Sequence, residues 1–511
     1  MPVRARLDAR PWAARNGERP TGFCGAIRGA AGHERGFLSA VRRLGESSVP
    51  PAWRMPAIAL QALVNLLVAS SASAAFVFNV NDINDDIDKD LVASQCETVN
   101  GTCTLRAAIM QANVVPNVDT TINLPAGTYT LTRLPAGGDG DDNGDLNLTD
   151  PVAGAPAIHI VGAGTDLTII DGNGTDRVLS VSGHRTVTIA GVSVTNGFLA
   201  APTSYGGCIA NSGDLTLIDS SVFNCTAMDD GSHLYGYGGG IYSSGGSLTL
   251  LRTRVFANHA YKGAGIYAYV FNTAVLSQSS VIGNEALAAG GGLFNVGTLT
   301  IDASTLAGNS ALLSGGAVFN ENILFATNST VSGNHAARYG GGIANYGTAN
   351  VYNSTIAFNQ ADSDADAFGG GGGAYNDISA TAFNVRNTLI AGNTRSLPAV
   401  ADDCLGALGF FSKNKLGSFS GCSSAANGTG TYTLLTSLAE IGPLRNNGGV
   451  TRTQALVPPS NLIDGAAICA DQNGATLTTD QRGRARSVGT SCDIGAFEYD
   501  PGDLFYSGFE P

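Results

Sequence analysis

Two pairs of neighbouring carboxylates, Asp229-Asp230 and Asp402-Asp403, are of a type and spacing that could do chemistry. An inverting glycosidase needs two carboxylates that face one cleft, one to donate a proton and one to activate water. Lys and Arg are sparse in the surrounding sequence, so no basic partner for proton abstraction stands out. Carboxylates in surface loops are also commonly only solvated. For these reasons no catalytic residue is assigned. Asp229 and Asp230 are kept only as candidates.

A second acidic run could bind calcium. Asp139, Asp141 and Asn143 precede a glycine in the D-x-D-x-N-G pattern of a calcium loop. Asp145 follows, and Asp150 stands at the twelfth position in place of the usual Glu. No helices are predicted on either side, so this is not an EF-hand pair. The alternative is a solvated acidic turn; structural calcium is the only cofactor that the sequence suggests.

Four aromatic residues recur at equivalent positions, namely Tyr242, Tyr267, Phe294 and Phe319. Stacked aromatic side chains attract one another by roughly 0.5–1.5 kcal/mol per pair. One interpretation is a structural ladder of rings. The other is a carbohydrate platform, if the rings are exposed.

Eight of the nine cysteines fall into near pairs, and the ninth is Cys24. None of the pairs has the CxxC spacing and histidines are few, which argues against zinc. An even set of paired cysteines is typical of an oxidising compartment. Sequential pairing predicts the disulfides Cys96–Cys103, Cys208–Cys225, Cys404–Cys422 and Cys469–Cys492.

An asparagine that returns about every 25 residues indicates the elements that must position these groups. Its spacings are 26, 25, 25 and 25 residues, at Asn258, Asn284, Asn309, Asn334 and Asn359. Between the asparagines, short runs alternate apolar and small polar residues and end at Gly or Asn, which is the pattern of β-strands. Such a repeat must stack on copies of itself. We predict an all-β fold, a single-stranded right-handed parallel β-helix of about ten coils between residues 158 and 393.

The N-terminal segment reads as a leader. Residues 1–54 hold ten arginines, and an apolar stretch at 56–68 leads into a run of Ala and Ser. This pattern predicts a signal peptide cleaved near Ala74 or Ala75. The basic part is long for a signal peptide. Either the true start codon lies further along the chain, or the leader is an extended one. The net charge of −13 becomes more negative after cleavage, which disfavours nucleic acid as a partner.

Cys103–Ile109, followed by Gln111 and Asn113, resembles the CSLREAI motif found near the start of many secreted bacterial β-helix proteins. Thr104 can cap a short helix, although Ala107 replaces the Glu that would complete a capping box. The resemblance implies a helix that covers the open end of the rod, as solenoids require.

The C-terminal region contains an ordered series of short segments, Ile441–Leu444, Asn447–Gly449, Ala455–Leu456, Ile463–Asp464, Thr479–Gly483 and Cys492–Tyr499. Together they resemble the choice-of-anchor Q domain of surface or secreted proteins. The tail, residues 503–510, is similar to short sorting tails that end in Gly-Phe-Glu. The resemblance implies an extracellular β-helix without assigned chemistry.

We therefore expect a secreted or cell-surface protein that is non-enzymatic and acts in adhesion, binding or the cell envelope. The alternative is a polysaccharide lyase or glycoside hydrolase of the pectin-lyase-like fold, with its site near Asp229 or residues 362–366; fold analogy alone is a weak argument for it. Expected partners are an extracellular polysaccharide or a cell-surface glycan. We expect a monomer that binds no nucleic acid. We also expect no membrane span in the mature chain. The predicted segments are a leader (1–75), a cap (76–150), the repeats (151–400), the choice-of-anchor Q-like region (401–499) and the tail (500–511).

Overall fold

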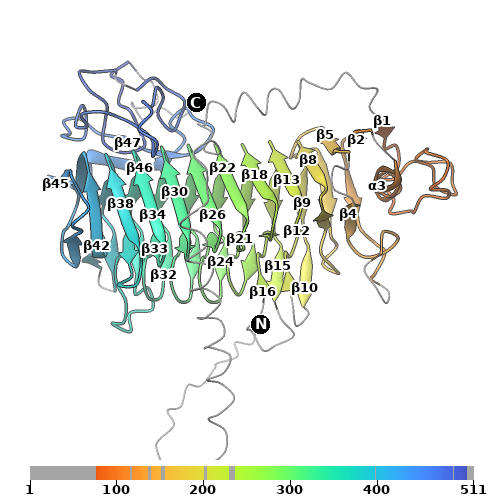
Figure 1. Cartoon of the computed structure of the whole chain (residues 1–511), viewed down its shortest axis with the longest axis horizontal. Coiled ribbons are helices and arrows are strands. Elements are labelled where there is room, and N and C mark those ends of the chain that lie inside the picture. Colours follow the sequence, from red (N-terminus) through yellow and green to blue (C-terminus); the bar gives the residue numbers. More distant parts are fainter. Residues whose placement is uncertain are drawn as a thin grey trace, which may run out of the picture. The chain divides into compact units, whose positions relative to one another are not determined.

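The computed structural model describes residues 76–502, apart from 116–117, 136–139, 151–155, 201–203, 229–235, 397–398 and 487. The described elements belong to one compact unit. Short parallel strands stand in a row in Figure 1, and the chain winds through them coil by coil. This arrangement confirms the predicted parallel β-helix. Among the described residues, no helix has the length and apolar character needed to cross a membrane.

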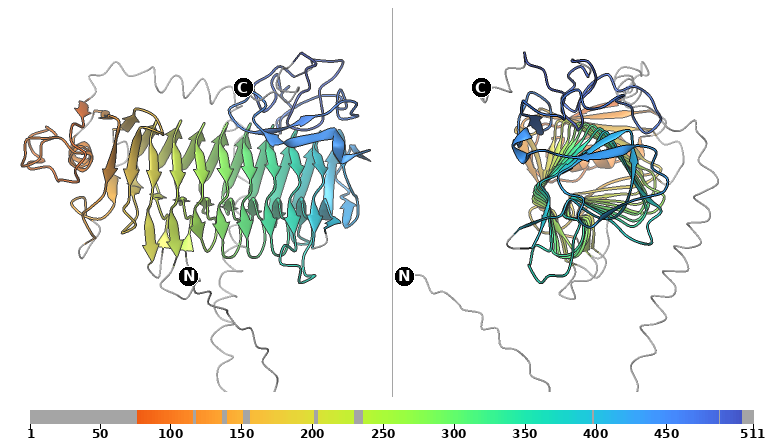
Figure 2. Two further views of the ribbon diagram at one scale, coloured as in Figure 1. Left: turned by 180° about the vertical axis from the view of Figure 1, so that it is seen from behind. Right: turned by 90° about the vertical axis from the view of Figure 1, so that its left-hand side faces the viewer.

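One coil contains four strands, as in β25 (Leu293–Asn295), β26 (Thr298–Asp302), β27 (Thr305–Ala307) and β28 (Ser310–Ala311). We call the surfaces that these strands build, in this order, faces 1 to 4. Each strand pairs in parallel with its equivalents in the coils before and after. Figure 2 shows the coils one behind another in the view turned by 90°.

Faces 1 and 2 form one 22-stranded sheet, because β42 (Cys404–Phe411) pairs with the last strands of both. Face 1 also contains β4 (Leu146–Asp150), β7 (Leu179–Gly183), β12 (Ile209–Asn211), β17 (Ile241–Ser243), β21 (Ile266–Ala268), β29 (Val318–Asn320), β33 (Ile343–Asn345), β37 (Ala374–Asn376) and, beyond β42, β44 (Cys422–Ser424). Face 2 contains β1 (Phe76–Asn79), β2 (Thr120–Leu124), β5 (Ile158–Gly162), β8 (Thr186–Ala190), β13 (Asp214–Ile218), β18 (Ser247–Leu251), β22 (Thr273–Ser277), β30 (Ile323–Thr327), β34 (Thr348–Tyr352) and β38 (Ala382–Arg386).

Face 3 is a 12-stranded sheet that runs from Gly127 to Leu434. The coils therefore extend beyond residues 158 to 393 on both sides, because the terminal coils lie outside the asparagine repeat on which that prediction rested. Besides β27, face 3 contains β3 (Gly127–Thr130), β6 (Thr168–Asp171), β9 (Ser193–Thr195), β14 (Ser221–Phe223), β19 (Arg254–Phe256), β23 (Ser280–Ile282), β31 (Thr330–Ser332), β35 (Thr355–Ala357), β39 (Leu389–Ala391), β43 (Lys413–Leu416) and β45 (Thr431–Leu434).

Face 4 is a sheet of shorter strands, nine in number, in which only the last pair is antiparallel. A separate two-stranded sheet of β11 (Ser204–Tyr205) and β16 (Gly236–Tyr237) follows its first coils. The other strands of face 4 are β10 (Phe198–Ala200), β15 (Thr226–Met228), β20 (His259–Ala260), β24 (Glu285–Ala286), β32 (His335–Ala336), β36 (Gln360–Ala361), β40 (Thr394–Arg395) and β41 (Val400–Ala401).

Alternating side chains build the core. In β26, Leu299 and Ile301 point into the rod and are buried, whereas Thr298 and Thr300 lie on the outer surface and are half-buried. The same alternation recurs in the paired strands, so apolar side chains stack on apolar side chains from coil to coil. Burial of a Leu or Ile side chain stabilises the folded state by roughly 1.5–3 kcal/mol.

The recurrent asparagines form a buried ladder at the corner between faces 3 and 4. Each asparagine side-chain amide donates a hydrogen bond of 2.8–2.9 Å, in five cases to the asparagine one coil further on and in the last case, from Asn393, to Asp403 ten residues later. The last acceptor is Asp403, and at the other end the Cys225 amide donates to Asn258 Oδ1. Burial raises the pKa of Asp403 to about 6. The ladder runs through Asn258, Asn284, Asn309, Asn334, Asn359, Asn393 and Asp403.

A second asparagine ladder lies at the corner between faces 1 and 2. Asn295, Asn320, Asn345 and Asn376 are joined by amide-to-carbonyl hydrogen bonds of 2.7–2.8 Å. The sequence analysis missed it, although two of its spacings show the same period of 25 residues.

The predicted capping helix is present as α3 (Leu105–Val114), and Thr104 Oγ1 accepts from the Ala107 amide as expected. Arg106 has a role that the sequence analysis missed. Its guanidinium is 2.7 Å from the Asp85 carboxylate, with both side chains buried, and it donates to the Gly144 carbonyl at 2.8 Å. The helix is therefore tied to the segments before and after it.

Residues 436–499, which we call the C-terminal lobe, include η2 (Leu438–Glu440) and a hairpin of β46 (Ile441–Arg445) and β47 (Thr453–Leu456). The lobe packs on the corner between faces 2 and 3 and is drawn in dark blue in Figure 1. Gln481 Nε2 donates to Thr305 Oγ1 at 2.9 Å, and Arg486 Nη2 donates to Asn328 Oδ1 at 2.7 Å.

Two buried ion pairs lie inside the lobe. Arg482 is 2.9 Å from Asp480, and Arg486 is 3.5 Å from Glu498. Asp480, Gln481 and Arg482 belong to the segment Thr479–Gly483. In this structure those residues hold the lobe together and attach it to the coils.

Candidate functional site

The four predicted aromatic residues form one continuous stack on face 1. Each is the middle residue of a three-residue strand, so it points outward while its two neighbours point inward. The ring centroids are 5.6 Å apart for Tyr242 and Tyr267, 4.9 Å for Tyr267 and Phe294, and 4.8 Å for Phe294 and Phe319. We call these four rings and their extensions the aromatic ladder.

The aromatic ladder is longer than the sequence analysis indicated. At one end Tyr205 stacks on Tyr242 at 4.8 Å. At the other end face 1 presents Ala344, and Tyr346 from the following turn stacks on Phe319 at 4.9 Å in its place. Tyr375 then continues the row, 5.9 Å from Tyr346.

The ring faces within the ladder are occupied by one another. Tyr267 and Phe294 are only 7% and 2% exposed, so they give cohesion and offer little surface to a ligand. The exposed aromatic surface comes from the turn after β21, where Tyr269 is 41% and Phe271 is 78% exposed. Tyr269 contacts the ladder, with its centroid 6.3 Å from that of Tyr242.

The hydroxyls of Tyr242 and Tyr346 stay protonated, and so remain hydrogen-bond donors, over the physiological pH range. Burial raises the pKa of Tyr242 to about 12, and the neighbouring Tyr205 adds to the shift. Burial also raises the pKa of Tyr346 to about 12, with Asp377 as the next cause. The Tyr375 hydroxyl donates to the Asp377 carboxylate at 2.8 Å.

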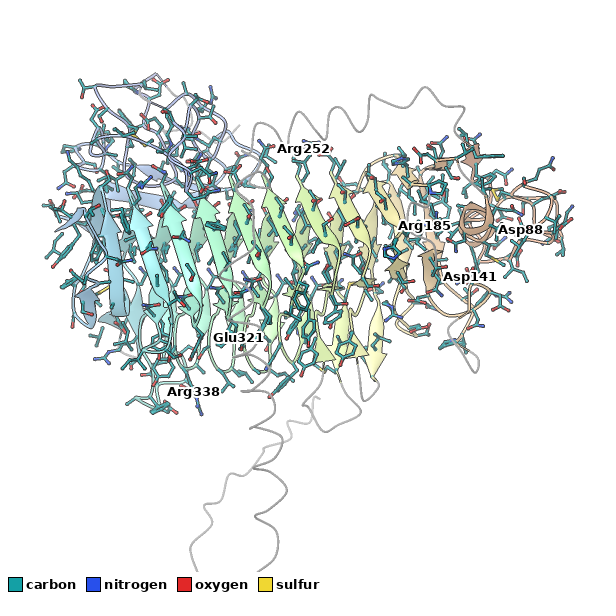
Figure 3. The ribbon with its side chains drawn as sticks, viewed as in Figure 1. Asp88, Asp141, Arg185, Arg252, Glu321 and Arg338 are labelled. Carbon is teal, nitrogen blue, oxygen red and sulfur yellow. A yellow bond between two sulfur atoms is a disulfide. The ribbon has the colours of Figure 1, made fainter. Side chains whose placement is uncertain are left out.

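Charged groups border the ladder. The Lys262 ammonium lies 5.1 Å from the centre of the Phe294 ring. The Glu321 carboxylate raises the pKa of Tyr267 further, after the larger effect of burial. Arg338 lies over the Phe368 ring at 5.3 Å, and Figure 3 shows Glu321 and Arg338 along the same edge of the rod. The site therefore combines aromatic edges, neutral hydroxyl donors and a few charges of both signs.

A carboxylate cluster lies in the loop that the sequence analysis singled out at residues 362–366. Oxygens of Asp362, Asp364 and Asp366 come within 4.8 Å of one another, a spacing that could hold a divalent cation. Asp362 is buried and accepts from Ser396 Oγ and from the Ala367 amide, while the other two carboxylates are exposed.

The remaining predicted carboxylates differ in position. Asp229 and Asp230 lie outside the described residues. Asp403 ends the asparagine ladder, and Asp402 accepts from the Gly371 amide at 2.9 Å. Asp402 and Asp403 are therefore engaged in holding the last coils.

Part of the predicted calcium loop is described. Asp145 is buried and lies 2.5 Å from Arg177, and Asn113 donates to Asp141 at 3.3 Å. Asn143 donates to Asp142 at 2.9 Å. Asp139 and the Asp150 side chain lie outside the described residues, and the calcium site stays a prediction.

All four predicted disulfides are present. Cys208–Cys225 joins consecutive parts of one early coil and places Cys225 at the position that Asn258 holds in the next coil. The disulfides thus reinforce the cap, an early coil, the last coil and the lobe.

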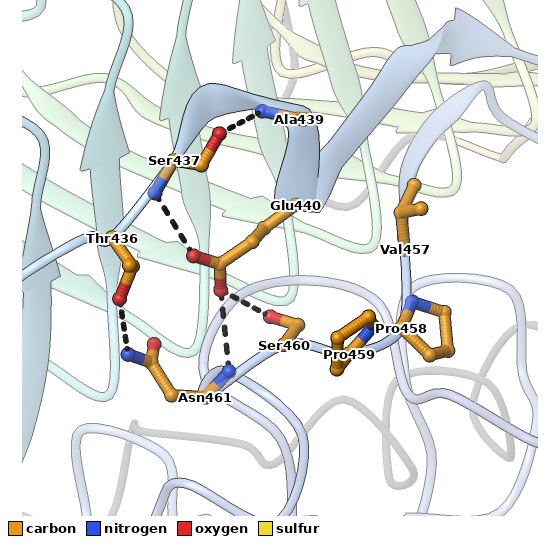
Figure 4. Close-up of a pocket in the computed structure, with 9 residues that line it drawn as sticks. All are labelled: Thr436, Ser437, Ala439, Glu440, Val457, Pro458, Pro459, Ser460 and Asn461. Carbon is orange, nitrogen blue, oxygen red and sulfur yellow. Dashed lines mark hydrogen bonds between the residues drawn. The ribbon is translucent and has the colours of Figure 1, made fainter.

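A surface pocket of about 550 Å³ lies beside η2 in the lobe. Figure 4 shows Glu440 at its centre, where its carboxylate accepts from the Ser437 amide, the Ser460 hydroxyl and the Asn461 amide at 2.8–3.2 Å. The oxygens of Glu440 join the start of η2 to the loop after β47, so we assign Glu440 a structural role.

Comparison with known proteins gives little beyond the fold. No family model matches the chain, and no curated protein is similar to it in sequence. Among solved structures, the crystal structure of pectate lyase Pel9A aligns with a TM-score of 0.46 and 16% identity, covering 84% of this chain and 99% of that chain. This likeness transfers neither an activity nor a site residue to this protein.

Proposed function

We propose that this protein is a non-enzymatic extracellular binding protein that holds a glycan along the aromatic ladder of face 1. The observation that carries the proposal is the pair of exposed rings, Tyr269 and Phe271, held beside the stacked row that runs from Tyr205 to Tyr375. Coils repeat about every 4.8 Å, which is close to the length of one sugar unit in an extended polysaccharide.

The chemistry of the row supports a neutral glycan. The exposed rings of Tyr269 and Phe271 can contact the apolar faces of sugars, and tyrosine hydroxyls can donate to sugar oxygens. The carboxylates of Glu321 and Asp377 border the row, and the chain has a net charge of −13, so a polyanionic polymer would be repelled.

A glycan array followed by calorimetry tests the proposal. Replacing Tyr269 and Phe271 together by Ala should weaken binding of any neutral glycan by about tenfold or more, because each exposed ring contributes roughly 1 kcal/mol. Val161→Ala, at an exposed position on face 2, is the matched control and should bind normally. Silence of the wild-type protein on a broad neutral array would refute the proposal.

A lyase or glycosidase activity is the second candidate, supported by the carboxylate cluster at Asp362, Asp364 and Asp366. If it is correct, calcium-dependent release of unsaturated uronate or reducing sugar should disappear in the double variant Asp364→Ala, Asp366→Ala. The pair Asp229→Ala, Asp230→Ala tests the other candidate loop. No product from pectin, alginate and neutral polymers would retire both.

The four disulfides support an extracellular location. Our proposal includes export, cleavage near Ala74 or Ala75, and a C-terminal sorting role consistent with the choice-of-anchor Q resemblance. N-terminal sequencing of protein recovered from the medium or the cell surface tests it; a mature N-terminus before residue 60 would contradict it.

The calcium proposal concerns the turn between Asp139 and Asp150. Millimolar calcium should raise the thermal midpoint, as any ligand that binds only the folded state does. The double variant Asp139→Ala, Asp141→Ala should lose that increase, whereas Asp364→Ala should keep it. An unchanged midpoint in the wild-type protein would remove the site.

A further inference from the structure

A shallow recess of about 370 Å³ lies at the corner between faces 3 and 4. Three consecutive coils contribute to it. Asn196 and Asn224 occupy equivalent positions, as do Phe198 and Thr226, whereas Asn173 lies one residue past the position opposite Asn196. We call it the corner recess. Its side chains are those of Asp171, Asn173, Asn196, Phe198, Asn224 and Thr226.

Its asparagines provide amides that the turn itself does not require. Asn173, Asn196 and Asn224 have left-handed backbone, with φ of 58°, 56° and 54°. The next coils make the same turn with Ala257 and Gly283, also at positive φ. Because Gly has no Cβ penalty in this conformation, the side chains of Asn196 and Asn224 are additions to the turn.

The polar groups of the recess are only partly engaged. Asp171 Oδ1 accepts a hydrogen bond from the Asn196 side-chain Nδ2 at 3.1 Å and one from the Asn173 backbone amide at 2.9 Å. Within the described part of the chain, Asp171 Oδ2 and the side-chain amides of Asn173 and Asn224 have no hydrogen-bond partner. Hydrogen-bond donors and an acceptor that could bind a ligand therefore lie around the Asp171 carboxylate.

Phe198 supplies an aromatic surface unlike that of face 1. Its side chain is 41% exposed, and it has no ring partner among the residues that the structure describes. In the aromatic ladder, by contrast, Phe294 is 2% exposed and stacked on both sides. A ring face that is free, beside planar amide and carboxylate groups, suits a ligand with one apolar face and several hydroxyls.

From this combination we infer that the corner recess binds a neutral sugar unit, independently of the aromatic ladder. Two coil steps span roughly 10 Å, enough for one or two sugar rings. The ring of Phe198 covers the apolar face of the sugar, and Asp171, Asn173 and Asn224 bind its hydroxyls. The Asp171 carboxylate disfavours acidic sugars.

Saturation-transfer NMR and titration of the full chain with neutral mono- and disaccharides test the inference. The probes are glucose, galactose, mannose, xylose, N-acetylglucosamine and their common disaccharides. At least one should bind, and Phe198→Ala should weaken it about tenfold or more. Asn224→Gly should weaken it several-fold without lowering the thermal midpoint, because Gly occupies this corner in later coils.

Two controls separate this site from the rest of the molecule. Ala257→Gly changes the same turn one coil outside the recess and should bind as wild type. The Tyr269→Ala, Phe271→Ala protein should also keep this binding, even though it loses any binding on face 1. Absence of saccharide binding, binding unchanged in Phe198→Ala and Asn224→Gly, or a response to calcium alone would each overturn the inference.

Discussion

The repeated coils and the C-terminal lobe bury polar groups in opposite ways. In the coils, neutral amides such as Asn284 and Asn309 make the same hydrogen bond at every step. In the lobe, charged side chains make contacts that occur once, as between Arg486 and Glu498 or Asp480 and Arg482. The difference shows that a repeat spreads the cost of burial over many equal bonds, whereas the lobe concentrates it in a few.

The largest expected effect is therefore in the lobe. Arg486→Met leaves Glu498 buried without its partner and removes the bond to Asn328, which should lower the free energy of unfolding by about 3–5 kcal/mol. Chemical denaturation measures it. Arg484→Met, at an exposed position two residues away, is the control and should change little. A loss below about 1 kcal/mol for Arg486→Met would mean that the lobe is not held by its buried charges.

A single break in the ladder should cost less. Asn309→Ala removes the acceptor of the Asn284 amide and a donor to Asn334, leaving buried polar groups unpaired. We expect a loss of about 1–3 kcal/mol by the same measurement. Asn322→Ala, in an exposed turn, should be nearly neutral. A cost for Asn309→Ala equal to that of Arg486→Met would erase the contrast between the two regions.

The third expected effect is a pH dependence at the junction between the two regions. Burial raises the pKa of Asp302 to about 7, and Asp471 of the lobe adds to the shift. A carboxyl whose pKa is raised in the folded state contributes most stability below its unfolded pKa near 4, and this contribution is lost as the pH rises to 7.

Asp302→Asn should therefore reduce the decline of stability between pH 4 and 7, by at most about 1.4 kcal/mol per pH unit. Denaturation midpoints across that range give the slope. Asp364→Asn, at an exposed carboxylate, should leave the slope as in the wild type. An unchanged slope in Asp302→Asn would show that Asp302 does not ionise differently on folding.

The contrast also explains which parts of the molecule could be predicted from the sequence. The period of 25 residues identified the fold and the first ladder, because equivalent residues pair with one another across coils. Asn295 and Asn320 carried the same signal and could have been found. The pairing of Arg486 with Asn328 joins residues 158 positions apart and repeats nowhere, so no local pattern indicated it.

The candidate site was partly visible for the same reason. The middle positions of face 1 identified Tyr242 to Phe319 as a ladder. Tyr346 was missed because it enters the stack from the following turn, where Ala344 occupies the strand position. The corner recess could not be predicted, because the repeat allows either Asn or Gly at its turn position and does not indicate which coils carry Asn. Phe198 does not recur at the repeat period, so no pattern indicated it.

Because the asparagine ladder that ends at Asp403 repeats the same bond from coil to coil, the length of the rod can change by whole coils. Every amide donates toward the C-terminal end, so the positive end of this row of dipoles meets a carboxylate, as acidic side chains meet helix N-termini. A duplicated coil placed between Asn309 and Asn334 would extend both asparagine ladders by one step and leave Cys225 and Asp403 as the two ends. Such a protein would have a longer rod without a new design for either end.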